Sequence, residues 1–129
     1  MQTPPLDGLH VLVLEDEFLI AMDLEQLCRD HGAANVTISR SLDGLSEPHF
    51  DAAIVDLRLG GVSTLDFAQR LAGDGIPFVF ATGYGPTEEL VARFPDVSVV
   101  TKPYVGDELV IALAGAVSNR RARTAEVGG

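Results

Sequence analysis

The fold can be argued from one short stretch, Ile54-Val55-Asp56-Leu57-Arg58-Leu59. Its apolar beginning extends back to Ala52 and ends in a single carboxylate, Asp56, and the glycine pair Gly60-Gly61 follows the stretch. A short apolar run with a polar end and a loop behind it is typical of a buried parallel strand. In open α/β sheets, ligands bind at the carboxyl ends of such strands. Taken alone, Asp56 could instead shape a turn or cap a helix, so its role depends on what ends the other strands.

Apolar runs and helical patterns alternate along the rest of the chain. We expect strands at residues 9–14, 36–38, 51–56, 78–81 and 97–100. We expect helices at residues 17–31, from Ser41 to before Pro48, and from Ser63 or Thr64 to a stop at Gly73 and Gly75. We expect two more, a short one that Pro86 and Thr87 open and Pro95 ends, and one at residues 107–121. Strands and helices that alternate across short connections form a parallel sheet with helices on both faces. The pattern predicts an α/β fold, a doubly wound five-stranded parallel sheet, as one domain at residues 9–123 between a lead at 1–8 and a flexible tail at 124–129.

Composition excludes several classes of protein. The 129 residues fit one domain, and no run approaches the roughly 18 apolar residues of a membrane helix. The formal net charge of −10 argues against direct contact with nucleic acid, because phosphate binding needs a basic surface. The first residues lack the features of a secretory signal, and the lone Cys28 suits a reducing compartment. We therefore expect a cytoplasmic protein that binds neither nucleic acid nor a membrane.

Polar side chains follow the other expected strands at the points where they end. The first strand is followed by Glu15-Asp16-Glu17, the fourth by Thr82, and the fifth by Lys102, the only lysine of the chain. Because parallel strands share one carboxyl edge, we expect these groups to converge on Asp56. Several carboxylates in one pocket need a cation, and oxygen ligands alone favour a hard ion such as Mg²⁺.

These groups together could bind and transfer a phosphoryl group. Mg²⁺ and Lys102 would neutralise phosphate charge, Thr82 would donate a hydrogen bond, and a carboxylate can act as nucleophile. The alternative is an acidic cluster that one lysine neutralises and that has a structural role only.

The motifs at these strand ends resemble those of a known family, the receiver domains of two-component response regulators. The likeness runs from Leu9 to about Ala122, and its markers are Leu12-Val13-Leu14-Glu15-Asp16-Glu17, Ile54-Val55-Asp56, Ala81-Thr82-Gly83 and Thr101-Lys102-Pro103-Tyr104. The resemblance implies a flavodoxin-like (βα)5 sheet with strand order 2-1-3-4-5.

The same resemblance implies a role for each site residue. Asp56 would accept the phosphoryl group of a kinase phosphohistidine as an acyl phosphate, with Thr82 and Lys102 contacting that group. Mg²⁺ would be held by Glu15, Asp16, Asp56 and the backbone carbonyl of Arg58. The donor would be a sensor histidine kinase or a histidine phosphotransferase. Family members often carry a cis peptide before the proline that corresponds to Pro103.

One further stretch, Pro77 to Tyr84 (PFVFATGY), is similar to the "FAT GUY" branch of receivers, which are mostly single-domain proteins associated with HWE histidine kinases. This likeness implies a stand-alone receiver that acts as a signalling switch or a phosphate sink. Phosphoryl transfer and autodephosphorylation would be self-catalysed, so we do not expect a turnover enzyme.

The chain departs from the usual receiver pattern at three positions. Gly60 stands where a proline is usual, which predicts a more pliable loop. Val99 replaces a common aromatic switch residue, and Tyr84 is a candidate substitute for it. Glu15 replaces the commoner aspartate, and its longer side chain should still reach a metal-bound water.

The outer face of the first helix carries the apolar residues Phe18, Leu19 and Met22 just after the acidic site. Scattered exposed apolar residues need no functional explanation. Because a kinase must approach Asp56 beside this helix, we predict that the three residues dock the kinase.

Two other functions remain open at this point. One is a Mg²⁺-dependent phosphatase or phosphotransferase with an aspartyl nucleophile, although the nucleophile would then be expected after the first strand. The other is a receiver-like interaction module that is never phosphorylated.

Overall fold

The computed structural model describes residues 4–43, 45, 49–83, 87–102 and 107–128, and the side chains of these up to residue 120. The elements in these residues are β1 (His10–Leu14), α1 (Phe18–Asp30), β2 (Asn35–Ser39), β3 (Ala52–Asp56), β4 (Arg58–Leu59), β5 (Val62–Ser63), α2 (Leu65–Gly73), β6 (Phe78–Thr82), α3 (Glu88–Arg93), β7 (Val99–Thr101) and α4 (Glu108–Gly128). None of the helices in this part of the chain is long and apolar enough to cross a bilayer.

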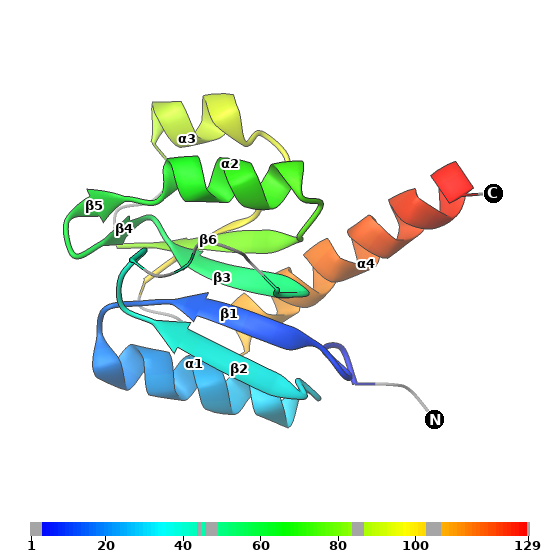
Figure 1. Ribbon diagram of the computed structural model, residues 1–129, viewed down its shortest axis with the longest axis horizontal. Helices are drawn as coiled ribbons and strands as arrows, with labels where there is room; N and C mark the ends of the chain where they lie inside the picture. Colours follow the sequence, from blue (N-terminus) through cyan, green and yellow to red (C-terminus); the bar gives the residue numbers. More distant parts are fainter. Residues whose placement is uncertain (1–3, 44, 46–48, 84–86, 103–106, 129) are drawn as a thin grey trace.

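The main sheet has five parallel strands in the order β2-β1-β3-β6-β7, with helices on both of its faces (Figure 1). This confirms the predicted fold class and the predicted order 2-1-3-4-5 of the main strands. The central strand β3 is buried at every residue, as its apolar composition predicted. Its last residue, Asp56, lies beside Ala81 of β6 in the register of the sheet.

Two hydrophobic cores lie on opposite faces of the sheet. Alternate residues of β1 supply them, because successive side chains of a strand point to opposite faces. Val11 and Val13 pack with α1 and α4, through residues such as Leu24 and Leu113. The other face, which receives Leu12 and Leu14, packs against α2 and α3, and its buried members include Phe67, Leu71, Phe78, Phe80, Leu90 and Phe94.

The short helix expected from Ser41 does not form in its described part, where residues 41–43 make bends and a turn. The Ser39 hydroxyl donates to the Ser41 carbonyl at 2.6 Å, and the Asp43 amide donates to the Ser41 hydroxyl at 2.9 Å. Such local side-chain bonds offer the backbone an alternative to a helix. That prediction was therefore wrong for the described residues, and residues 44 and 46–48 lie outside them.

An antiparallel hairpin, β4–β5, follows the central strand and was not expected. Gly60 and Gly61 form its two-residue loop with φ of +59° and +83°. A two-residue hairpin loop of this kind needs positive φ at both central residues, which glycine adopts without strain. The glycine pair was thus a signal for a hairpin rather than for a pliable loop alone.

The two ends of the described chain also differ from expectation. Leu6, assigned to a lead before the domain, is fully buried in the core, and its amide donates to the His31 carbonyl at 2.9 Å. Helix α4 continues to Gly128 and extends past the end of the sheet in Figure 1, where we expected it to end near Arg121.

Candidate functional site

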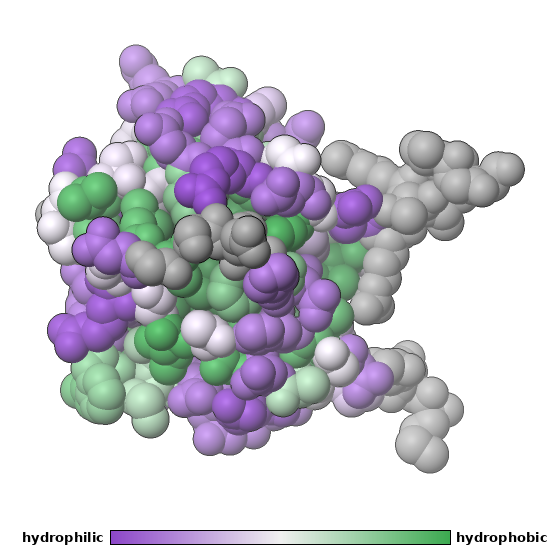
Figure 2. Space-filling model, viewed as in Figure 1, coloured by the Kyte–Doolittle hydropathy of each residue, from purple (hydrophilic) through white to green (hydrophobic). Residues whose placement is uncertain are grey.

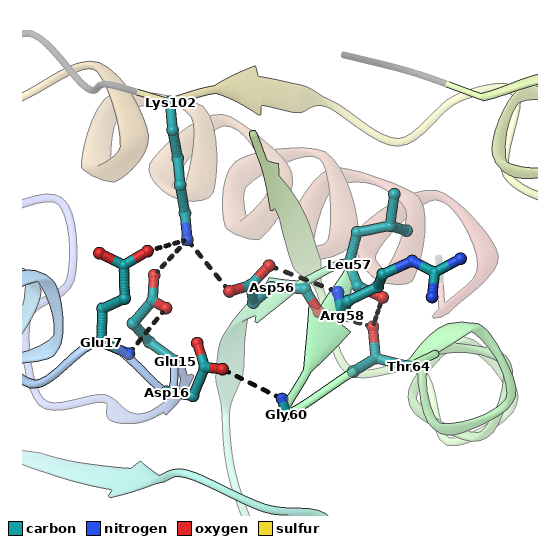
Figure 3. Close-up of polar contacts among 9 residues, drawn as sticks. All are labelled: Glu15, Asp16, Glu17, Asp56, Leu57, Arg58, Gly60, Thr64 and Lys102. Carbon is teal, nitrogen blue, oxygen red and sulfur yellow. Dashed lines mark hydrogen bonds and ion pairs between the residues drawn. The ribbon is translucent and has the colours of Figure 1, made fainter. Parts of the chain in front are cut away.

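The carboxyl edge of the sheet gathers the polar residues that end its strands (Figure 3). Glu15 and Asp16 follow β1, Asp56 ends β3, and Lys102 follows β7. Thr82 is the buried last residue of β6, and its carbonyl accepts from the Lys102 amide at 2.7 Å. The predicted convergence of residues from separate strands is therefore observed.

Lys102 lies among three carboxylates. Its Nζ is 3.1 Å from Asp56 Oδ2, 2.8 Å from Glu15 Oε1 and 3.9 Å from Glu17 Oε1. Burial would by itself lower the pKa of Lys102, but its electrostatic interactions with Glu15 and Asp56 outweigh this effect and raise the pKa. Lys102 therefore stays protonated and supplies one positive charge among the three carboxyl groups.

The carboxyl group of Glu15 is almost completely buried, with 1% of its surface exposed. Oε2 accepts from the Glu17 amide at 3.2 Å. Oε1 is close enough to Lys102 Nζ for an ion pair but lacks the directional geometry of a hydrogen bond. Burial raises the pKa of Glu15 to about 7, Lys102 opposes this shift, and Asp56 adds to it. One lysine therefore does not fully compensate the acidic pocket.

A metal ion fits the acidic residues of the pocket. One carboxylate oxygen from each of Glu15, Asp16 and Asp56 lies within 4.8 Å of the others. Glu15 Oε1 is buried and accepts no hydrogen bond, and all the side-chain ligand atoms of the cluster are carboxylate oxygens. A hard divalent cation prefers ligands of this kind. These three residues can hold such an ion together.

The hairpin after β3 contributes backbone groups to the same pocket. The Gly60 amide donates to Asp16 Oδ2 at 3.1 Å, and this bond is the main cause that lowers the pKa of Asp16. The Arg58 amide donates to Asp56 Oδ1 at 3.4 Å, while the Arg58 side chain is exposed. Asp16 and Asp56 therefore each accept a hydrogen bond from the hairpin.

Thr64 lies at the site, although the sequence predicted it only as a candidate helix cap. Its hydroxyl is fully buried and donates to the carbonyls of Asp56 at 2.6 Å and of Leu57 at 3.0 Å. Thr64 is the N-cap residue of α2, but its side chain makes no capping bond, and the Ser63 hydroxyl accepts from the Leu65 amide at 3.3 Å. The sequence carries no signal for this contact, because the burial of the Thr64 hydroxyl is seen only in the folded structure.

The residues proposed for signal output are only partly described. Val99 is half-buried in β7, where it lies beside Phe80 of β6 and packs on the core that faces α2. Tyr84, the candidate for the missing aromatic residue, lies outside the described residues, and so do Pro103 and Tyr104. Their predicted roles stay predictions.

The outer α1 patch, defined as Phe18, Leu19 and Met22, lies on the surface as predicted. The exposed fractions are 63%, 77% and 44%. Hydrophobic atoms are visible over the beginning of α1, at the lower left of Figure 2. The opposite side of the helix is buried through Leu24 and Cys28. The patch is thus accessible, and its docking role stays a prediction.

Known proteins similar to this chain are regulators of transcription and signalling. The chain is 33% identical over 126 residues to the transcriptional regulatory protein PdtaR of Mycobacterium tuberculosis, a match that spans 90% of the chain. The response regulator PhyR from Brucella abortus has a similar structure, with a TM-score of 0.77 and 28% identity over 92% of this chain and 52% of that one. The non-phosphorylated HemR receiver domain from Leptospira biflexa matches at a TM-score of 0.70 with 25% identity, over 84% of this chain and 94% of that one.

The chain spans only 53% to 60% of the length of the curated relatives it matches. No protein-family model matches it. The similarity therefore concerns only part of each of those relatives.

Proposed function

We propose that the chain is a receiver domain of the response-regulator type and that Asp56 accepts a phosphoryl group from a histidine kinase. One observation carries the proposal: Lys102 Nζ lies 3.1 Å from Asp56 Oδ2, while Asp56 also shares an oxygen cluster with Glu15 and Asp16. A carboxylate that faces both a lysine and a candidate cation site is arranged to receive a negatively charged group.

The transfer forms one bond and breaks another. An Asp56 carboxylate oxygen attacks the phosphorus of a phosphohistidine, and the P–N bond breaks as the imidazole nitrogen leaves with the electron pair and takes up a proton. The product is an acyl phosphate on Asp56 and a neutral histidine on the donor. Lys102 is already in contact with Asp56 and would pair with the incoming phosphoryl oxygens. The Thr82 hydroxyl, at the neighbouring strand end, would donate to another of these oxygens.

Mg²⁺ is the cation that suits this chemistry, since it favours carboxylates, waters and phosphate oxygens as ligands. Glu15, Asp16, Asp56 and the Arg58 carbonyl would hold it. When bound, it would neutralise phosphoryl charge that Lys102 alone does not balance. Two neighbouring groups would keep the ligands in place. The Gly60 amide donates to the Asp16 carboxylate, and the Thr64 hydroxyl donates to the Asp56 carbonyl.

The wider context is also a proposal. The motif at residues 77–84 supports a donor of the HWE kinase type, or a histidine phosphotransferase that relays its signal. We propose that phosphorylation switches a binding surface or stores phosphate. The acyl phosphate would be lost slowly by autodephosphorylation in the same pocket, without turnover of a substrate. A stand-alone role stays a prediction, because the curated relatives extend well beyond the matched region.

The direct test is labelling with acetyl phosphate and Mg²⁺, followed by intact mass. Wild-type protein should gain one phosphoryl group, and Asp56→Asn should gain none. Asp96→Asn, a change of the same kind at an exposed aspartate, should label like wild type. A wild-type protein that takes no label from acetyl phosphate or from any kinase would contradict the proposal and favour an interaction module that is never phosphorylated.

A further inference from the structure

The tip of the β4–β5 hairpin is bonded directly to the acidic pocket. The Gly60 amide donates to Asp16 Oδ2 at 3.1 Å, although the two residues are 44 positions apart in the sequence (Figure 3). Asp16 stands on the segment after β1, whereas Gly60 belongs to the loop after β3. The bond therefore joins two loops of the site that lie far apart in the sequence.

The hairpin that presents this amide is itself fixed at several points. At its base, the Thr64 amide and hydroxyl both donate to the Leu57 carbonyl, at 3.1 Å and 3.0 Å. Leu59 is buried in the core between the sheet and α2. Near the tip, Arg58 Nη1 donates to the Gly61 carbonyl at 3.5 Å. The Gly60 amide is thus held by a short, anchored structure.

The loop geometry makes this amide available. Gly60 and Gly61 both have positive φ, and a Cβ added to either would meet nothing within 4 Å. Glycine is therefore required by the backbone conformation and not by crowding. A proline at position 60 would have no amide hydrogen to donate. The bond to Asp16 is therefore possible because this chain has Gly60 where the usual receiver pattern has proline.

The geometry points to the Gly60 amide as a positioning group that holds the Asp16 carboxylate in place for a divalent cation. Asp16 is the most exposed of the three acidic residues of the cluster, and its side chain would otherwise sample several rotamers. The bond to Gly60 keeps one Asp16 oxygen within 4.8 Å of oxygens from Glu15 and Asp56. This inference rests on the proposed cation site, which it deepens.

A reciprocal effect follows by linkage. If the hairpin amide improves cation binding, then a bound cation must stabilise the amide's bond to Asp16 by the same factor. Hydrogen-bond partners of metal ligands typically change metal affinity by about 10-fold to 100-fold when they are lost. A bond from one backbone amide to one carboxylate belongs at the lower end of that range.

The test removes the amide hydrogen without changing a side chain. Gly60 is replaced by glycolic acid in semisynthetic protein, so that its peptide N–H becomes an ester oxygen, and Gly61 is replaced in the same way as the matched control. Mg²⁺ binding is measured by isothermal titration calorimetry, and the fold by circular dichroism. We expect the ester at position 60 to weaken Mg²⁺ binding about 10-fold, and the ester at position 61 to leave it within about twofold of wild type. Equal affinities in the two esters would overturn the positioning role.

A second measurement uses the unmodified protein. Amide hydrogen exchange followed by NMR should show Gly60 protected relative to Gly61, with the protection rising on addition of Mg²⁺ and falling in Asp16→Ala. A Gly60 amide that exchanges as fast as Gly61 under all these conditions would overturn the inference. A wild-type protein that binds no Mg²⁺ would overturn the cation site itself, whereas binding that the ester at position 60 leaves unchanged would overturn only the role of Gly60.

Discussion

The hydroxyl of Thr64 donates a 2.6 Å hydrogen bond to the backbone carbonyl of Asp56, so the N-cap residue of α2 holds the residue that ends the central strand. Thr64 is fully buried, and its hydroxyl also lies 3.0 Å from the Leu57 carbonyl. A buried carbonyl without a partner costs free energy. This one side chain therefore contributes both to the stability of the loop and to the position of the Asp56 backbone.

Replacing Thr64 with valine removes the hydroxyl at nearly constant shape. We expect Thr64→Val to lower the free energy of unfolding by about 1–3 kcal/mol, because the Asp56 carbonyl loses its donor in a buried position. The measurement is urea unfolding followed by circular dichroism. Thr64→Ser keeps the hydroxyl and loses only a methyl group, so it should retain more stability than the valine variant. If valine proves as stable as wild type, the bond to Asp56 contributes nothing.

Lys102→Met removes the ammonium group that faces Asp56 and Glu15. We expect the initial rate of labelling by acetyl phosphate to fall by about 100-fold, since loss of one preorganised charged donor has an effect of that order. Lys102→Arg keeps the charge with a different shape and should retain part of the rate. Labelling of the methionine variant at the wild-type rate would remove Lys102 from the mechanism.

Much of this site could be predicted from the sequence, because the parallel sheet places all carboxyl ends of its strands at one edge. Glu15-Asp16 and Asp56 directly follow the apolar ends of their strands, and Lys102 stands two residues after Val100, so the pattern of strand ends predicted that these residues meet. The contact between Gly60 and Asp16 could not be predicted, because a backbone amide has no sequence signature and its partner is 44 residues away.

The incorrect predictions concern residues whose contacts depend on the folded structure. Ser41 has the composition of a helix cap, but its hydrogen bonds with Ser39 and Asp43 stabilise a turn instead. Leu6 lies in a proline-containing lead with no periodic pattern, and only the packed structure reveals that it belongs to the core. Thr64 was assigned to a cap because the sequence did not reveal that its hydroxyl would be buried under the Asp56 carbonyl.

The stability of the metal-free protein should depend on the titration of Glu15. Its pKa is raised to about 7 in the folded state from 4.5, so the folded protein binds more protons than the unfolded chain between these values. Its contribution to stability therefore falls as pH rises from about 4.5 to 7. The lowered pKa of Asp16 acts in the opposite direction and at lower pH.

We expect the metal-free protein to lose roughly 2 kcal/mol of stability between pH 5 and pH 7.5. Glu15→Gln should remove most of this loss, as seen in urea unfolding at several pH values. Mg²⁺ binding should tighten over the same interval, because the ion competes with the proton on Glu15. A Glu15→Gln protein with the pH profile of wild type would assign the loss to another group.

Cys28 should be inert in the native protein. Its thiol is fully buried on the inner face of α1, and burial raises its pKa to about 12, with a smaller effect from Glu25. We expect no reaction with Ellman's reagent at pH 8 in buffer and one equivalent of reaction in urea. Reaction of the native protein at the rate of the unfolded chain would show that α1 opens readily from the sheet.

The outer α1 patch gives the last prediction, which separates docking from chemistry. Phe18 is 63% exposed at the start of α1, close along the chain to Asp16, and it is not among the buried residues that pack this helix onto the sheet. We expect Phe18→Ser to reduce phosphoryl transfer from the kinase by at least about 10-fold, in line with the loss of an aromatic anchor at an interface. Labelling by acetyl phosphate should stay at the wild-type rate, since a small donor needs no docking surface. Ile111→Ser is the matched control, because Ile111 is 65% exposed on α4. If Phe18→Ser slowed transfer from both donors equally, the effect would lie at the phosphorylation site and not in docking. If Ile111→Ser slowed transfer from the kinase as much as Phe18→Ser does, the kinase would not distinguish α1 from α4.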